Sequence, residues 1–152
     1  MAVDSRQKGA RAEAALVKLL IADTGFTWKR TPGSGALHAD HLLKGDCYIP
    51  GEHNLFVIEI KHYKDCHLTC NLLTDKNPQL LIWWEQAKRQ GVQVSKKPIL
   101  FFKHDRSKWF VALRKQDAIL PKKYLHYMPE DLVICTYDQF KTYIMPEVEF
   151  IK

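Results

Sequence analysis

The chain has 152 residues, 46% of them hydrophobic and 26% charged, which predicts one soluble globular domain spanning residues 1–152. It contains no apolar run near the roughly 20 residues of a membrane span, and its first residues lack the apolar segment of a signal peptide. We therefore expect a cytoplasmic protein without a membrane partner, whose four irregularly spaced cysteines are reduced thiols.

The net charge of +6 is unevenly distributed along the chain. Residues 130–152 hold five acids and two bases, a net charge of −3, so residues 1–129 carry +9. A basic body indicates a polyanionic partner, most simply nucleic acid. Ordinary solubility charge is the alternative explanation.

A helix is predicted over about residues 5–22. Asp4 and Gln7 resemble a capping box at its start, and Gly25 is expected to stop it. Its apolar stripe has helical spacing and contains Ala10, Leu16, Val17 and Leu20.

Glu13 lies on or beside this stripe. One interpretation is a boundary glutamate that reaches water, and the other is a carboxylate directed at a site. Arg6, Lys8 and Arg11 crowd the first turns, where cations oppose the helix dipole. Their placement suggests phosphate contact.

Residues 26–30 predict a short strand, followed by a turn-rich loop over 31–35. The Gly-Ser-Gly segment around Ser34 would let backbone N–H groups and a hydroxyl approach a phosphate, although a plain connecting loop fits equally well. Further along this loop stand three possible metal ligands, for which a solvated loop is the favoured interpretation: His38, Asp40 and His41.

Residues 44–61 predict a β-hairpin with a tight Pro-Gly turn. Its second strand, 55–61, is strongly apolar yet ends in Glu59-Ile60-Lys61. Glu59 and Lys61 point to the same face, about 7 Å apart, because side chains alternate along a strand. Antiparallel pairing brings Asp46 opposite residues 57–59.

Two carboxylates and an ammonium group thus converge on one face of an apolar sheet. Burying them is costly unless a metal ion or a phosphate compensates. Carboxylate oxygens suit Mg²⁺ or Mn²⁺, and such an ion lowers the pKa of a bound water and offsets charge on an attacked phosphate. Lys61 beside the ion would position or activate that water, or stabilise the transition state. The cluster therefore predicts phosphodiester hydrolysis.

The segment 62–77 is polar and irregular. Zinc binding is conceivable there, but the spacing fits no familiar finger and a surface loop is favoured. The four candidate ligands are His62, Cys66, His67 and Cys70.

A second helix is expected from about Pro78 to Gln90, ending at Gly91. Its apolar side consists of Leu80, Leu81, Trp84 and Ala87. Trp83 and Trp84 diverge by about 100° on a helix, so one of them is either exposed for a dimer interface or covered because the helix is buried on two sides.

The remaining elements are a hairpin with strands over 98–103 and 108–113, a strand over 132–136 and a short helix over 138–143. We expect the hairpin to extend the sheet begun by residues 44–61.

Several short motifs in this order resemble a known family. Asp46 with Glu59-Ile60-Lys61 is similar to the core of the PD-(D/E)xK nucleases. Within that superfamily, the archaeal-type Holliday junction resolvases, which some phages also encode, show the same ordered set. The matching segments are Lys8-Gly9 with Glu13, Arg30 with Ser34-Gly35, Gly45-Asp46, Glu59-Ile60-Lys61, Glu85-Gln86-Ala87 with Gly91, and the hairpin over 98–113.

The resemblance implies an α/β restriction-endonuclease-like core, a central mixed β-sheet flanked by helices. It implies a homodimer that cuts four-way DNA junctions with Mg²⁺, in the cytoplasm of the host cell if phage-encoded. Glu13, Asp46 and Glu59 would hold the metal, and Lys61 would act as the base or orient water. Arg30 and Ser34 would contact the scissile region. The DNA-binding residues expected in all are Arg6, Lys8, Arg11, Lys29, Arg30, Ser34, Lys44 and Lys64.

The sequence departs from the family pattern at two points. Gly45 replaces the proline of the motif name, which we expect to change only the start of the strand. Residues 36–44 lengthen the preceding loop, so Asp40 competes as the motif acid, although its distance from Glu59 fits the hairpin register less well.

Two other functions remain open from the sequence. One is another nuclease of the same fold, of restriction or repair type, acting on duplex or branched DNA. The other is a basic DNA-binding module without chemistry.

Overall fold

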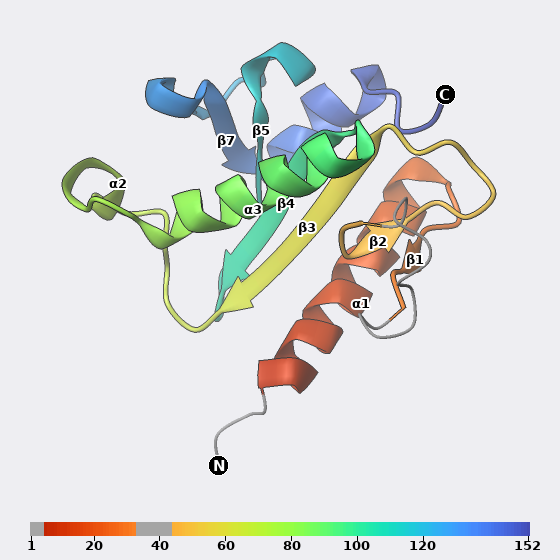
Figure 1. Cartoon of the computed structure of the whole chain (residues 1–152), viewed down its shortest axis with the longest axis horizontal. Coiled ribbons are helices and arrows are strands. Elements are labelled where there is room, and N and C mark those ends of the chain that lie inside the picture. Colours follow the sequence, from red (N-terminus) through yellow and green to blue (C-terminus); the bar gives the residue numbers. More distant parts are fainter. Residues whose placement is uncertain (1–4, 33–43) are drawn as a thin grey trace.

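A seven-stranded sheet with helices on both faces organises residues 5–32 and 44–152, the part of the chain that the computed structural model describes (Figure 1). Its strand order is β1-β2-β3-β4-β5-β7-β6. β3 and β4 are parallel and every other pair is antiparallel, so the sheet is mixed. The expected α/β class, with a central mixed sheet flanked by helices, is confirmed.

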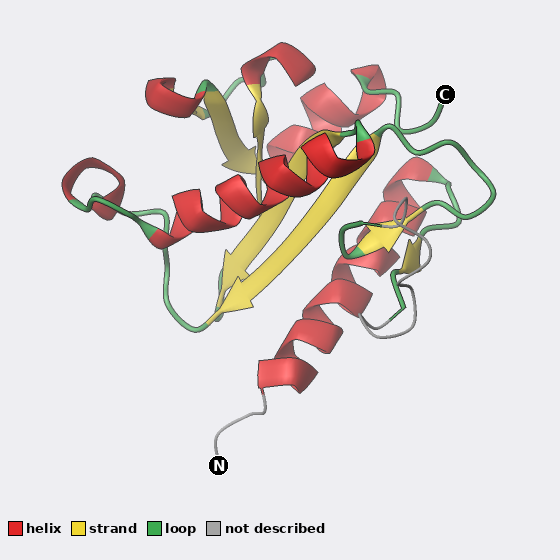
Figure 2. Cartoon of the chain, in the orientation of Figure 1, coloured by secondary structure: helices red, strands yellow, loops and turns green. Residues whose placement is uncertain are grey.

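Figure 2 shows the helices and strands along the chain. The strands are β1 (Lys29–Arg30), β2 (Cys47–Tyr48), β3 (Phe56–Tyr63), β4 (Lys97–His104), β5 (Phe110–Arg114), β6 (Leu125–Tyr127) and β7 (Leu132–Thr136). The α-helices are α1 (Ser5–Thr24), α2 (Asn71–Thr74), α3 (Gln79–Val94) and α4 (Tyr137–Gln139). Shorter turns are η1 (Lys115–Asp117), η2 (Met128–Glu130), η3 (Phe140–Ile144) and η4 (Met145–Glu147), of which η3 is π-helical. No helix in the described ranges is long and apolar enough to span a bilayer.

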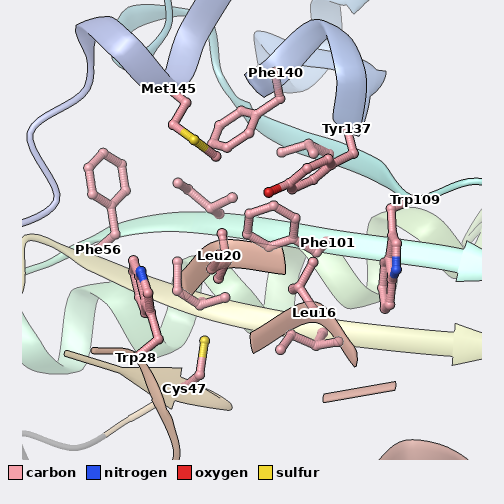
Figure 3. Close-up of a cluster of buried hydrophobic side chains, with 14 of the residues drawn as sticks. Leu16, Leu20, Trp28, Cys47, Phe56, Phe101, Trp109, Tyr137, Phe140 and Met145 are labelled. Atoms are coloured by element: carbon pink, nitrogen blue, oxygen red, sulfur yellow. The ribbon is translucent and has the colours of Figure 1, made fainter. Parts of the chain in front are cut away.

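The sheet separates two hydrophobic cores. α1 and the C-terminal turns cover one face, where Leu16 and Leu20 pack with Phe101 and Phe140 (Figure 3). α3 covers the other face, where Trp84 packs with apolar side chains of β4, β5 and β7. Successive side chains of β3 point to opposite faces of the sheet, as the period of two requires. Residues 56, 58 and 60 belong to the α1 core, so Glu59 and Lys61 face the opposite side.

α1 and the first turn agree with the sequence analysis. The helix continues two residues further than expected and ends at Gly25, whose N–H donates to the carbonyl of Ile21 at 3.0 Å. Asp4, the predicted cap, lies outside the described residues.

The prediction that α3 ends at Gly91 is wrong. The helix continues to Val94, and Ser95 in the left-handed region closes it. Gly91 serves a close approach instead, because a Cβ there would lie 2.6 Å from the carbonyl oxygen of Lys96. The N–H of Lys96 donates to the carbonyl of Gly91 at 2.9 Å. The chain thus turns back directly over this glycine into β4.

The suggestion that Trp83 or Trp84 is exposed for a dimer interface is also wrong. Their exposed fractions are 3% and 0%. Trp84 faces the sheet, whereas Trp83 is covered by the rings of Tyr63 and His67, with centroid distances of 4.7 and 5.2 Å. The helix is therefore buried on two sides, the alternative that the 100° divergence allowed.

Other boundaries shift modestly. The strand expected over 26–30 is reduced to β1, because Trp28 turns into the core and donates its indole N–H to Thr24 Oγ1 at 2.9 Å. The segment 62–77 contains the short α2, and β6 is an edge strand that the sequence did not indicate. The hairpin of β4 and β5 extends the sheet as expected, with β4 beside β3.

The predicted register of the 44–61 hairpin is confirmed. Cys47 pairs with Ile58 in antiparallel fashion, and the N–H of Asp46 donates to the carbonyl of Ile58 at 2.7 Å. Gly45 makes this approach possible because it has no side chain. Its φ is +88°, and a Cβ at this position would collide with the carbonyl oxygen of Ile58, at 2.7 Å. The φ angle of proline is fixed near −65°, so the proline of the family motif cannot stand at position 45. The exchange for glycine therefore does more than change the start of the strand, which was the expected effect.

We expect Gly45→Ala to be clearly more destabilising than Gly51→Ala. Both glycines have positive φ, at +88° and +75°. An alanine in that conformation lowers the free energy of unfolding by roughly 1 kcal/mol or more in either variant. Only at position 45 does the added Cβ also collide with backbone. Urea unfolding of the two variants measures the difference, and equal midpoints would show that β2 does not depend on this close approach.

Candidate active site

The hairpin of β2 and β3 places Asp46 against the strand that carries Glu59 and Lys61. Asp46 Oδ2 accepts a hydrogen bond from the backbone N–H of Ile60 at 2.7 Å. The Asp46 N–H donates to Ile58 O, so both its backbone and its side chain are held to β3. The Asp46 carboxylate is thereby anchored between the positions of Glu59 and Lys61.

Glu59 is buried in the middle of β3, with 3% of the residue exposed. Lys61 Nζ lies 3.7 Å from its Oε2, and the side chain of Lys61 is 20% exposed. The side-chain amide of Gln90, on α3, forms a hydrogen bond with the Glu59 carboxylate. The charged pair therefore sits between the sheet and the second half of α3.

Burial dominates the electrostatics of the two acids. It raises the pKa of Asp46 to about 6, against the opposing hydrogen bond from Ile60 N–H. It raises the pKa of Glu59 to about 7, and repulsion from Asp46 adds to this, while Lys61 and the Gln90 amide act in the other direction. Lys61 alone does not balance two buried carboxylates, so the site favours an added cation or a proton.

Glu13 lies at the edge of this site rather than inside it. Its Oε2 accepts hydrogen bonds from Arg30 Nη2 at 3.0 Å and Arg30 Nε at 3.1 Å. Its charge still raises the pKa of both Asp46 and Glu59. Across residues 5–32 and 44–152 no three His, Cys, Asp or Glu side chains are grouped closely enough to hold a metal ion. The expected three-carboxylate set is thus not assembled while Glu13 is paired with Arg30.

The donor chemistry nevertheless fits a hard divalent cation. Mg²⁺ keeps several waters and is bound through one or two carboxylates plus substrate phosphates. Asp46 and Glu59 supply two carboxylates whose charged forms are disfavoured by burial. A cation beside them would remove that penalty.

The expected DNA-binding cations differ in their partners and in their exposure. Lys8 Nζ pairs with Asp105 Oδ1 at 2.6 Å, and Arg30 pairs with Glu13. Lys44 is half-buried just before Gly45. Exposed positions are Arg6, Arg11, Lys29 and Lys64. Ser34 lies outside the described residues, as do His38, Asp40 and His41.

The zinc alternative for residues 62–70 is not supported by their arrangement. His62 Nε2 is bonded to Asp105 Oδ1 at 2.9 Å, and Cys66 Sγ donates to the carbonyl of Leu68 at 3.5 Å. His67 packs its ring edge-on against Trp83. This segment covers α3, as a surface loop does.

Two residues of the site region were missed by the sequence analysis. Gln90 follows Glu59 by 31 positions, and only the fold of α3 back over β3 brings them together. Asp105, in the β4–β5 turn, pairs with Lys8 in the first turn of α1 and with His62 near the end of β3. A lone glutamine on a helix and an aspartate in a turn carry no spacing signal that would have singled them out.

Comparisons with known proteins show the family to which the chain belongs. The sequence profile of a family described as "Phage putative PDDEXK endonuclease" matches residues 4–149. Protein D14 of Escherichia phage T5 is 43% identical over 123 residues, covering 79% of this chain and 77% of that protein. The Archaeoglobus fulgidus Hjc structure, a Holliday junction resolvase, is similar over 90% of both chains, with 16% identity and a TM-score of 0.43. The family match confirms the resemblance to the PD-(D/E)xK nucleases.

The raised pKa values predict an unusual pH dependence of stability in the presence of a chelator. A carboxyl group whose pKa is higher in the folded state binds more protons folded than unfolded, so its contribution to stability falls as pH rises. We expect the free energy of unfolding of the metal-free protein to fall by about 1–3 kcal/mol between pH 4.5 and pH 8, with most of the decrease below pH 7.5.

Urea unfolding in EDTA across this range measures the effect. Asp46→Asn and Glu59→Gln should each flatten the curve, whereas Glu52→Gln, at an exposed position of the hairpin turn, should not. A stability that rises steadily from pH 4.5 to pH 8 would contradict the proposed burial of the two acids.

Proposed function

Because this chain belongs to the family of phage PDDEXK endonucleases, we propose that it is a metal-dependent DNA endonuclease that resolves four-way junctions. The observation that carries the hydrolytic part is the convergence of Asp46, Glu59 and Lys61 on one face of the β2–β3 hairpin. The proposal that the substrate is a four-way junction rests on the ordered motifs from Lys8 to Lys61.

Asp46 and Glu59 would hold the divalent ion, Mg²⁺ or Mn²⁺, with Glu13 as the third acid. When bound, such an ion lowers the pKa of a coordinated water and offsets charge on the attacked phosphate. In the reaction a water oxygen bonds to phosphorus, one ester P–O bond breaks, and the leaving oxygen takes up a proton.

Lys61 is the group that acts on the water or on the phosphate. Its Nζ is held near Glu59 at 3.7 Å and remains partly exposed, so it reaches a substrate from the solvent side. There its neutral amine would accept a proton from the attacking water, or its ammonium form would orient that water and stabilise negative charge in the transition state.

Arg30 links the metal site to DNA. It is paired with Glu13 in this structure, and both side chains are only partly exposed, at 44% and 22%. A phosphate beside Arg30 would compete for its guanidinium group, which binds phosphate in a bidentate manner. Glu13 would then be free to join Asp46 and Glu59. Binding of DNA and completion of the metal site are coupled in this proposal.

The junction specificity implies a homodimer, because two symmetric cuts require two active sites related by a two-fold axis. A nuclease of restriction or repair type, acting on duplex or branched DNA, is the alternative within the same fold. In either case the basic residues around Arg6, Arg11, Lys29 and Lys64 would contact the phosphate backbone.

We expect Asp46→Asn and Glu59→Gln to abolish Mg²⁺-dependent cleavage while DNA binding survives, because each removes a metal ligand and no phosphate contact. Lys61→Met should lower the cleavage rate about 10²–10⁴-fold. Single-turnover cleavage and gel-shift binding measure the two effects, with Glu52→Gln as a matched exposed control. Cleavage by Glu59→Gln at the wild-type rate would exclude this site.

The substrate preference is tested separately. We expect a four-way junction to be cut at paired symmetric positions, much faster than a linear duplex of the same sequence, and only with Mg²⁺ or Mn²⁺. EDTA should stop both reactions. Equal rates on the junction and the duplex would instead support the restriction or repair alternative.

A further inference from the structure

The side-chain amide of Gln90 forms a hydrogen bond through its N–H group, whereas its carbonyl oxygen has no partner among the described residues. The residue lies on α3, one turn before its end, and its amide hydrogen-bonds Glu59. Its Oε1 is fully buried and has no hydrogen-bond partner among the described residues. A buried amide carbonyl without a partner is costly and uncommon in native proteins.

The surroundings of Gln90 restrict what can satisfy this oxygen. The charged groups that act on Glu59 include Asp46, an acceptor when ionised, and Lys61, a donor. Lys61 Nζ lies 3.7 Å from Glu59 Oε2 but makes no hydrogen bond to Gln90 Oε1. Reversing the amide would place Oε1 against the Glu59 carboxylate and lose the existing hydrogen bond. No donor among residues 5–32 and 44–152 reaches this oxygen, and a water is the smallest donor that would satisfy it.

We propose that Gln90 is a positioning residue of the metal site, which holds Glu59 through its amide N–H and binds a metal-bound water through Oε1. This inference rests on the proposed function. Groups that hydrogen-bond a metal's ligands orient them, and their loss lowers metal affinity about 10–100-fold in known sites. Gln90 thus does for Glu59 what the Ile60 N–H does for Asp46.

The experiment compares the binding of Mn²⁺, measured by calorimetry on the full chain without DNA, in three variants. Gln90→Met keeps the length of the side chain and removes both polar atoms. Gln90→Glu keeps an acceptor oxygen. Gln93→Met is the matched control, because Gln93 lies on the exposed face of the same helix.

We expect Gln90→Met to weaken Mn²⁺ binding at least 10-fold and Gln93→Met to leave it within 2-fold of wild type. Gln90→Glu should bind Mn²⁺ at least as tightly as wild type, yet melt at a lower temperature in EDTA, because it adds a buried charge beside Glu59. If Gln90 had only a packing role, Gln90→Glu would not combine a lower melting temperature in EDTA with undiminished Mn²⁺ binding.

Unchanged Mn²⁺ affinity in Gln90→Met would overturn the inference while leaving the nuclease proposal intact. If Gln90→Met does not fold, Gln90→Glu decides, and weaker Mn²⁺ binding than wild type overturns the inference. Failure of the proposed function gives a different result: wild-type protein then neither binds Mn²⁺ nor cuts DNA, and the role of Gln90 falls with it.

Discussion

The burial of two carboxylates beside a single lysine is the constraint on which this structure depends. Asp46 and Glu59 repel each other, and burial disfavours the charged form of both. The fold resists that repulsion with directed hydrogen bonds, from the Ile60 N–H to Asp46 and from Gln90 to Glu59. Such an arrangement is unfavourable in the absence of a cation, and a cation bound beside the two acids would reduce that cost. The rest of the sheet keeps the two acids together in spite of it.

The periodicity of the sequence was sufficient to locate this arrangement. Alternation along residues 55–61 placed Glu59 and Lys61 on one face, and the turn at Gly51 fixed the register that brings Asp46 beside them. These inferences succeed because they involve residues close in sequence, whose geometry the backbone of a hairpin determines. The order of motifs then identified the superfamily correctly.

Features that depend on distant parts of the chain were beyond such reasoning. Gln90 meets Glu59 only because β3 and β4 are parallel, so that α3 must cross back over the sheet. Trp83 is buried by residues of the 62–77 segment, which showed no pattern at all. Gly91 appeared to be a helix stop, although its role is a close contact with Lys96. In each case a tertiary contact overrides the local signal.

The parallel crossover from β3 through α3 to β4 also has a consequence for folding kinetics. Pairing Phe56 with Lys97 closes a long loop, which is slow compared with forming the β2–β3 hairpin. We therefore expect the hairpin to pair before this loop closes, while the carboxylates of Asp46 and Glu59 are still hydrated. Their burial would then be completed only when α3 packs on the sheet, and protonation or a bound cation would lower the cost of that step.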